Sequence, residues 1–152
     1  MRQEPTPSVP ENARDRLTLR SQLADLSLVS RWLQALVARY HFSERTSFAI
    51  DLCLEEALSN VIRHGYAGDP TQKLDIEFSM GADGCLSFVI EDAAPHFRPF
   101  DPAAPLAEPS TVPLEDIVPG GQGIPLMRKF ADAVDWEPLE KGNRLTLRFS
   151  RK

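Results

Sequence analysis

Seven prolines fall between Ala93 and Gly121, and this interruption limits the folds that the chain can adopt. No helical or strand period survives around them: Pro95, Pro99, Pro102, Pro105, Pro109, Pro113 and Pro119. Proline lacks the backbone N–H that a helix interior or a central strand needs, so neither element is expected here. Loops of this length inside a compact domain are usually functional, often as lids, or else disordered. The sequence therefore predicts two patterned blocks separated by a mobile lid at residues 95–119.

The first block opens with one strand and two helices. Residues 16–23 alternate apolar and polar side chains, which is the pattern of a strand with one buried face. In residues 26–42 apolar side chains recur at three- and four-residue steps, as on an amphipathic helix. Ser43 is a favourable N-cap residue, so a second helix is predicted to begin there, run to about His64 and stop at Gly65.

Two hairpins supply the remaining strands. Residues 73–80 and 85–92 alternate apolar and polar side chains and are joined by the turn "GADG". Residues 132–139 and 144–150 form a second pair, which is split by the turn "EKGN". Each pair predicts two neighbouring antiparallel strands.

A short helix is predicted at 123–134, "GIPLMRKFADAV", with Pro125 in its first turn, where proline is tolerated. The order is then strand, helix, helix, strand, strand, loop, helix, strand, strand. This order predicts an α/β fold of the α+β two-layer sandwich type, with a mixed, mainly antiparallel sheet and helices on one face. Residues 15–152 are expected to form one domain, and residues 1–14 a mobile N-terminal tail.

Composition argues against several classes of partner. The 152 residues carry a formal net charge of -5 and have a pI near 5.2, which disfavours nucleic acid and anionic membranes. Cys53 and Cys85 lack metal-ligand spacing and are expected to be reduced core residues. No apolar run approaches the roughly 20 residues of a membrane span, and residues 1–14 lack a signal-peptide segment, so a cytoplasmic protein is expected. A homodimer is one assembly that the sequence leaves open.

Glu56 and Asn60 stand four residues apart on the second predicted helix and form no ion pair. At about 100° per residue, the apolar side chains of residues 50–61 fall within an arc of roughly 140°. Glu56 and Asn60 lie at the border of this arc, half facing out, and the opposite side carries Asp51, Glu55, Ser59 and Arg63. A carboxamide oxygen at the border can coordinate Mg²⁺, and a carboxylate there can reach a ligand. An ordinary solvated helix edge carries the same residue types, so the pair alone leaves both interpretations open.

Three glycines precede the third predicted helix, and an aspartate ends the second strand of the first hairpin. Gly120, Gly121 and Gly123 let the backbone approach a phosphate closely, and the helix start adds free N–H groups. A flexible loop before a helix is the alternative interpretation. Asp92 can accept a hydrogen bond from an exocyclic amine such as that of adenine, or it can end the strand without a ligand.

Taken in order, these features resemble the GHKL ATPase superfamily, which includes gyrase, MutL and the histidine kinases. Residues 56–60, "EALSN", look like its E-x-x-x-N box. Asp92 looks like the aspartate of its next box, and residues 120–124, "GGQGI", look like its glycine box. The resemblance covers about residues 15–150. It implies a Bergerat-type ATP-binding fold with ATP and Mg²⁺ as cofactors.

The resemblance also implies a role for each matching position. Glu56 would be the general base that activates the attacking hydroxyl group. Asn60 would hold the Mg²⁺ ion that bridges the ATP phosphates. Asp92 would bind the adenine amine, with Ala94 near the ring. The glycine box would complete the nucleotide site through Gly120, Gly121, Gly123 and Ile124.

Within the superfamily, "FDP" at 100–102 and "GNRLTLR" at 142–148 resemble the anti-sigma-factor serine kinases. The resemblance implies a serine/threonine-protein kinase that sequesters a sigma factor and phosphorylates a STAS-domain anti-anti-sigma factor. Ala94 and Pro125 stand where the family usually has glycine. They favour the alternative of a non-catalytic nucleotide-binding or purely protein-binding module, whereas Glu56 favours catalysis. A histidine-kinase catalytic domain fits less well, because those domains commonly carry asparagine at the position of Glu56.

Overall fold

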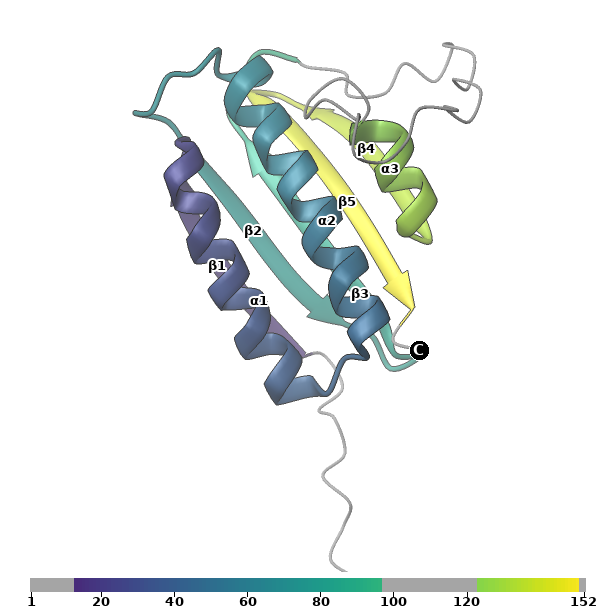
Figure 1. Cartoon of the computed structure of the whole chain (residues 1–152). Coiled ribbons are helices and arrows are strands. Elements are labelled where there is room, and N and C mark those ends of the chain that lie inside the picture. Colours follow the sequence, from purple (N-terminus) through teal and green to yellow (C-terminus); the bar gives the residue numbers. More distant parts are fainter. Residues whose placement is uncertain (1–12, 97–122, 151–152) are drawn as a thin grey trace, which may run out of the picture.

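Helices cover one face of a five-stranded sheet, which gives the protein two layers (Figure 1). The computed structural model describes residues 13–96 and 123–150. The strands are β1 (Ala13–Arg20), β2 (Lys73–Met80), β3 (Cys85–Asp92), β4 (Ala133–Leu139) and β5 (Gly142–Ser150). The helical elements are the 3-10 turn η1 (Leu23–Asp25), the α-helices α1 (Leu26–Tyr40), α2 (Glu44–Asn60) and α3 (Gly123–Phe130), and the π-helical turn η2 (Val61–Gly65).

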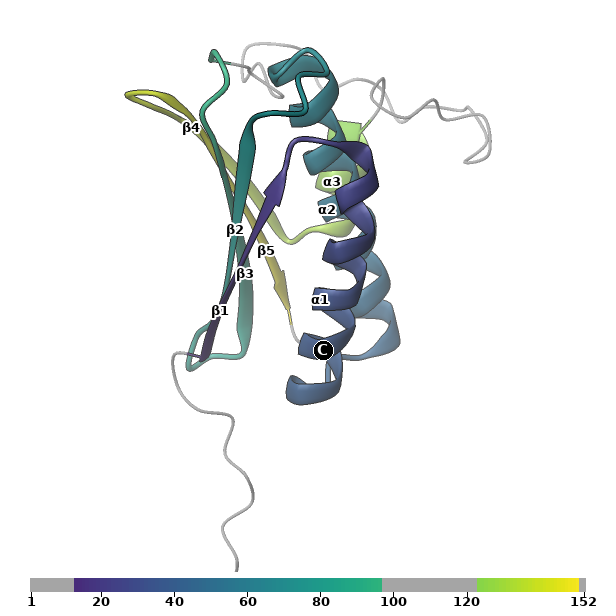
Figure 2. The ribbon, with the colours of Figure 1, turned by 90° about the vertical axis from the view of Figure 1, so that its left-hand side faces the viewer.

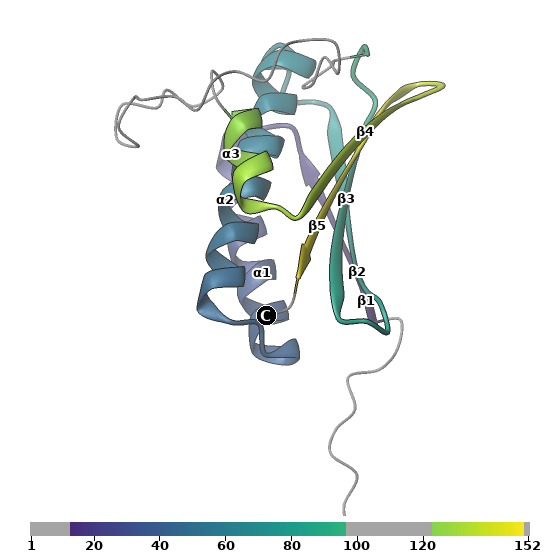
Figure 3. The ribbon, with the colours of Figure 1, turned by 90° about the vertical axis from the view of Figure 1, so that its right-hand side faces the viewer.

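The sheet has the strand order β1-β2-β3-β5-β4. Figure 2 and Figure 3 show from opposite sides that α1, α2 and α3 all lie on the same face of it. The predicted α+β class with helices on one face is confirmed. Each pair of neighbouring strands in the described residues is antiparallel, so no parallel pair of the expected mixed sheet is found among them. No helix in the described part of the chain is long and apolar enough to cross a bilayer.

The first hairpin has the predicted bounds because its alternating pattern permits one register only. Phe78 of β2 lies opposite Phe88 of β3, and both side chains are fully buried under the helices. Their ring centroids are 5.3 Å apart, and Tyr40 of α1 packs on the Phe78 ring at 5.5 Å. A slip of the pairing by one residue would turn these rings toward solvent. That register would lose their apolar burial and would be much less stable.

The helix that carries Glu56 and Asn60 begins where predicted and ends in a wider turn. The hydroxyl of Ser43 accepts the backbone N–H of Thr46 (3.1 Å), so Ser43 is the N-cap of α2. After α2 the backbone N–H of Tyr66 donates to the carbonyl of Val61, five residues back (2.8 Å). The predicted stop at Gly65 is confirmed, but the last turn is π-helical.

Several predicted bounds are wrong, and two of the errors have a local hydrogen bond as their cause. β1 ends at Arg20 instead of residue 23, because the carboxylate of Asp25 accepts the Arg20 N–H (3.0 Å) and the chain turns into η1. α3 ends before residue 134, because the N–H of Asp132 donates to the Arg148 carbonyl (2.8 Å) and the chain joins the sheet. β1 also begins inside the predicted tail of residues 1–14, at Ala13.

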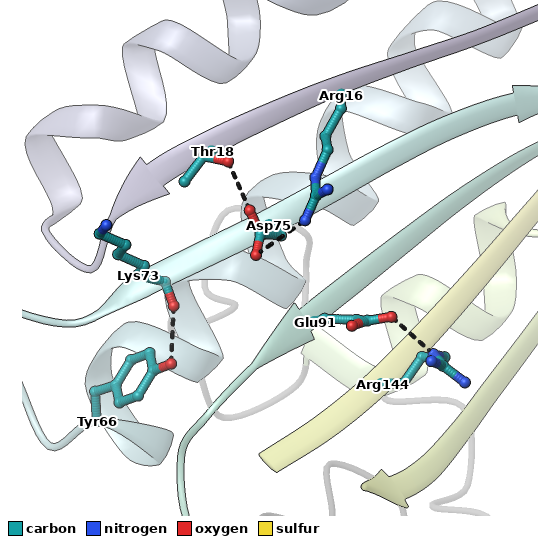
Figure 4. A network of polar contacts seen from close by, with 7 residues as sticks. All are labelled: Arg16, Thr18, Tyr66, Lys73, Asp75, Glu91 and Arg144. Atoms are coloured by element: carbon teal, nitrogen blue, oxygen red, sulfur yellow. Dashed lines mark hydrogen bonds and ion pairs between the residues drawn. The ribbon is translucent and has the colours of Figure 1, made fainter. Parts of the chain in front are cut away.

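The sheet face away from the helices carries polar side chains in cross-strand pairs (Figure 4). Asp75 of β2 accepts the Thr18 hydroxyl (2.6 Å) and lies 3.4 Å from the Arg16 guanidinium. The Arg144 guanidinium of β5 contacts Glu91 (3.0 Å) and, on β4, Glu137 (2.7 Å). The ion-paired side chains keep between 38% and 65% of their surface accessible to water, so each pair adds little to stability.

Replacing Ser43 by alanine should destabilise the protein by about 1 kcal/mol, because the Thr46 N–H loses its cap. Urea denaturation of variant and wild type measures the difference. Ser43→Asp is the matched control, because aspartate caps helices as well as serine does and should restore most of the stability. Equal stability of Ser43→Ala and wild type would show that the cap contributes nothing.

Candidate functional site

The helix α2 brings Glu56 and Asn60 to its C-terminal end, one turn apart. α2 lies between α1 and α3 and contacts both (Figure 1). Asn60 was expected to be half exposed, but only 4% of its surface is accessible, and Glu56 is half-buried. Ser59, predicted on the solvent side, is also buried, and its hydroxyl donates to the Glu55 carbonyl (2.6 Å). These side chains are more buried than expected because helices flank α2 on two sides, whereas a surface helix packs against neighbours on one side only.

Two buried acceptors at this end of α2 lack a donor. Oε2 of Glu56 and Oδ1 of Asn60 have no hydrogen-bond partner among the described residues. Leaving a buried polar group unsatisfied costs about 1–3 kcal/mol, and native proteins rarely do so without cause. The two oxygens therefore indicate a site for a cation, a water molecule or a ligand donor.

The chemistry of this pair fits Mg²⁺, which prefers oxygen ligands and keeps several of its waters. The described residues contain no group of three or more His, Cys, Asp or Glu side chains that could hold a metal ion. Asn60 Oδ1 can therefore supply at most part of a coordination shell, with the remaining ligands coming from water or phosphate oxygens.

Cys53, one turn before Glu56, connects this part of α2 with α3. Its sulfur lies 4.0 Å from the carbonyl oxygen of Met127. Burial, with a further contribution from the negative charge of Glu56, raises the pKa of the Cys53 thiol to about 12. The thiol is therefore protonated and unreactive at neutral pH. Cys53 and Cys85 are both free thiols, as predicted, but only Cys53 is fully buried.

Asp92 is the last residue of β3, and its carboxylate is held from one side. Its Oδ1 accepts the side-chain amide of Asn143 (2.8 Å) and the backbone N–H of Ala94 (2.9 Å). Oδ2 accepts no hydrogen bond from the described residues. Burial raises the pKa of Asp92 above its ordinary value, and the hydrogen bonds from Asn143 and Ala94 partly offset this rise. Asp92 thus presents one unused, partly desolvated carboxylate oxygen.

Asn143 is a site residue that the sequence analysis missed. It lies opposite Asp92 in the β3–β5 register, is buried, and also donates toward the carbonyl of Pro95 (3.2 Å). In the sequence it belongs to the predicted turn "EKGN". However, the inward alternation of Leu145, Leu147 and Phe149 extends back to Asn143. A polar side chain at an inward strand position was the available signal.

Glycine is required next to Asn143. A Cβ atom on Gly142 would lie 1.7 Å from the carbonyl oxygen of Asp92, and the φ of Gly142 is +115°. Only glycine allows β5 to start this close to the end of β3. Ala94 was expected to place its methyl group near a bound ring. Ala94 is buried, and a Cβ on Gly65 would meet its methyl group at 3.2 Å; the expected place beside a ring stays a prediction.

A pocket of about 20 Å³ is lined both by Asn60 of α2 and by the hydrogen-bonded pair Asp92 and Asn143. It is lined by Ala57, Asn60, Val61, Asp92, Met127, Trp136, Asn143 and Leu145. This volume has room for about one water molecule, so a larger ligand requires the walls to move apart. Met127 belongs to α3, and movement of that helix would widen the pocket.

The predicted glycine segment is only partly described. Gly123 and Ile124 are the first two residues of α3, which places the start of this helix on the same side of the sheet as the pocket, and Pro125 lies in the first turn as expected. Gly120 and Gly121 lie outside the described residues. So does nearly all of the predicted lid at 95–119.

Replacing Asp92 by asparagine should raise the free energy of unfolding at neutral pH. Burial raises the pKa of Asp92 in the folded state. The stability that this group contributes is therefore fully present at pH values below its ordinary pKa of 3.8, and it is lost as the pH rises through the folded-state pKa. Asparagine keeps the Oδ1 acceptor for Asn143 and does not ionise. The stability gap between variant and wild type should therefore be widest at neutral pH.

Denaturant titrations from neutral pH to below 3.8 measure this gap. It should close on acidification, when Asp92 becomes protonated in the wild type. A gap that stays constant with pH would contradict a raised pKa.

Comparison with known proteins assigns the chain to a family. Residues 19–149 match the histidine kinase-like ATPase domain family. The serine/threonine-protein kinase BtrW of Bordetella bronchiseptica is 28% identical over 116 residues, which are 76% of this chain and 79% of BtrW. The crystal structure of the RsbU and RsbW domains of Rv1364c from Mycobacterium tuberculosis is similar in fold, with a TM-score of 0.66 and 14% identity.

That similarity covers 91% of this chain and 32% of the mycobacterial chain. The present chain therefore spans about a third of the length of the mycobacterial chain. At this identity the similarity bears on the fold alone. The family match includes all the described site residues, from Glu56 to Asn143. The predicted resemblance is therefore confirmed, and the chain belongs to the histidine kinase-like ATPase domain family.

Proposed function

We propose that the protein is an ATP-dependent protein serine kinase of the anti-sigma-factor type. In this proposal it binds a sigma factor and phosphorylates a serine of a STAS-domain anti-anti-sigma factor. Family membership and the similarity to a named serine/threonine-protein kinase support the kinase class. The observation that carries the proposal is the pair of unsatisfied buried oxygens on Glu56 and Asn60, of which Asn60 lines the pocket together with Asp92.

The two ends of the pocket would serve the two ends of ATP. Asp92 Oδ2, which accepts no hydrogen bond from the described residues, would accept the exocyclic amine of adenine. Asn60 Oδ1 would be a ligand of Mg²⁺, whose other ligands would be phosphate oxygens and water. Bound Mg²⁺ would neutralise charge on the phosphates. The start of α3 would offer backbone N–H groups to the same phosphates.

Glu56 would act as the general base. Its side chain is half-buried, so part of it would remain accessible to a partner's hydroxyl group. Glu56 would accept the proton of the attacking serine hydroxyl while the serine oxygen bonds to the γ-phosphorus and ADP leaves. Cys53, the nearby thiol, stays protonated and does not compete for this role.

Replacing Asn60 by alanine should weaken ATP binding about tenfold when Mg²⁺ is present, because a ligand to a charged group is lost. Without Mg²⁺ the affinity should change little. Calorimetric titration with and without Mg²⁺ measures both values. Asn60→Asp is the matched control, since it keeps an oxygen at the same place and should retain the magnesium dependence. If wild type binds no ATP in either condition, the proposed function is wrong.

Replacing Glu56 by glutamine should slow phosphate transfer to the STAS-domain partner by roughly 10²–10⁴-fold, because the amide accepts no proton. ATP affinity should stay close to wild type. Transfer of radioactive γ-phosphate to the partner measures the rate, and Glu55→Gln is the matched control on the exposed side of α2. A wild type that binds ATP and partner but transfers nothing would be a non-catalytic module. A Glu56→Gln variant as fast as wild type would exclude Glu56 as the base.

A further inference from the structure

Tyr66, the residue after η2, connects the ends of two strands through its hydroxyl group. The hydroxyl donates to the carbonyl of Lys73 (2.8 Å) and accepts the backbone N–H of Ala93 (2.7 Å). Figure 4 shows the ring reaching the start of β2. The side chain is buried, so water does not readily replace either hydrogen bond. Tyr66 therefore fixes the residue that directly follows Asp92.

The Tyr66 hydroxyl takes the place of one rung in the β2–β3 ladder. The last paired residues are Leu74 and Asp92, and the same register would next place Lys73 opposite Ala93. Those two backbone groups instead bond to the phenol oxygen, which stands between them. The hydroxyl group thus bridges the two backbone groups, and β3 ends at Asp92.

The π-helical turn puts Tyr66 in this position. It begins directly after Asn60, and the i to i+5 bond from the Tyr66 N–H to Val61 closes it (2.8 Å). Gly65 in the same turn lies against the methyl group of Ala94. One short segment therefore follows Asn60 and contacts both residues that follow Asp92. The position of Asn60 relative to Asp92 therefore depends on this segment.

Asp92 is restrained from the opposite side by β5. Gly142 packs on its carbonyl and Asn143 holds its Oδ1. We propose that Tyr66 is the positioning residue on the β2 side, which aims the free Oδ2 of Asp92 at the exocyclic amine of an adenine nucleotide. This inference rests on the proposed function, because it requires that the pocket accept adenine.

A protonated phenol is needed for this role, since one group must donate to Lys73 and accept from Ala93. Burial raises the pKa of Tyr66, and the nearby carboxylates of Asp92 and Asp75 raise it further against the opposing hydrogen bond from Ala93. The hydroxyl therefore keeps its proton at neutral pH. Phenylalanine would retain the ring and remove both bonds, which frees Ala93 to move toward β2 and takes Asp92 with it.

The test compares two nucleotides that differ in the amine alone. Tyr66→Phe should weaken ATP binding about tenfold, since two buried backbone groups lose their partner and Asp92 shifts. The affinity for purine riboside triphosphate, which lacks the 6-amino group, should change by less than about twofold, because it makes no bond to Asp92. In an Asp92→Asn background, Tyr66→Phe should no longer alter the preference for ATP.

The outcomes separate this role from a merely structural one. Equal losses for both nucleotides, or no loss for ATP, would overturn the positioning role and leave the proposed function intact. If the wild-type chain fails to bind ATP, the proposed function is overturned and this inference with it.

A second measurement tests the inference even if the Tyr66→Phe variant does not fold. The chain has two tyrosines, so labelling with 3-fluorotyrosine gives two fluorine resonances, and Tyr40→Phe assigns them. ATP should shift the Tyr66 resonance clearly more than purine riboside triphosphate does. Equal shifts, or none, would overturn the positioning role.

Discussion

The hydrogen bond from Asn143 to Asp92 joins β3 to β5 at the point where both strands meet the candidate site. It holds a carboxylate that burial alone would disfavour, and it leaves one oxygen of that carboxylate unused. Gly142 makes the bond possible, because a side chain there would collide with the Asp92 backbone. Asp92 and Asn143 line the pocket together with Asn60 of α2 and Met127 of α3, so the shape of the pocket depends on this junction.

The sequence predicted most of the architecture because alternation and helical spacing constrain it strongly. The first hairpin, the cap at Ser43 and the helix border that carries Glu56 follow from local patterns. The burial of Ser59 and Asn60 could not be predicted in the same way, because it depends on α1 and α3 flanking α2.

Asn143 and Tyr66 were missed for a similar reason. Each acts on a partner far away in the sequence: Asn143 on Asp92, and Tyr66 on Lys73 and Ala93. Periodicity within one element says nothing about such pairs. Only the strand order, with β5 next to β3, brings Asn143 to the pocket.

The strand order also determines when the site can exist during folding. Asp92 and Asn143 are 51 positions apart, and the proline-rich segment lies between them. The elements β1, α1, α2, β2 and β3 precede this segment in the sequence, whereas β5 follows it, so the pairing of β5 with β3 carries the entropic cost of bringing distant parts of the chain together. A chain that has assembled only its N-terminal half therefore holds Glu56, Asn60 and Asp92 but still lacks Met127, Trp136 and Asn143, which complete the candidate pocket. The candidate pocket is thus a property of the completed topology, because its walls come from both sides of the proline-rich segment.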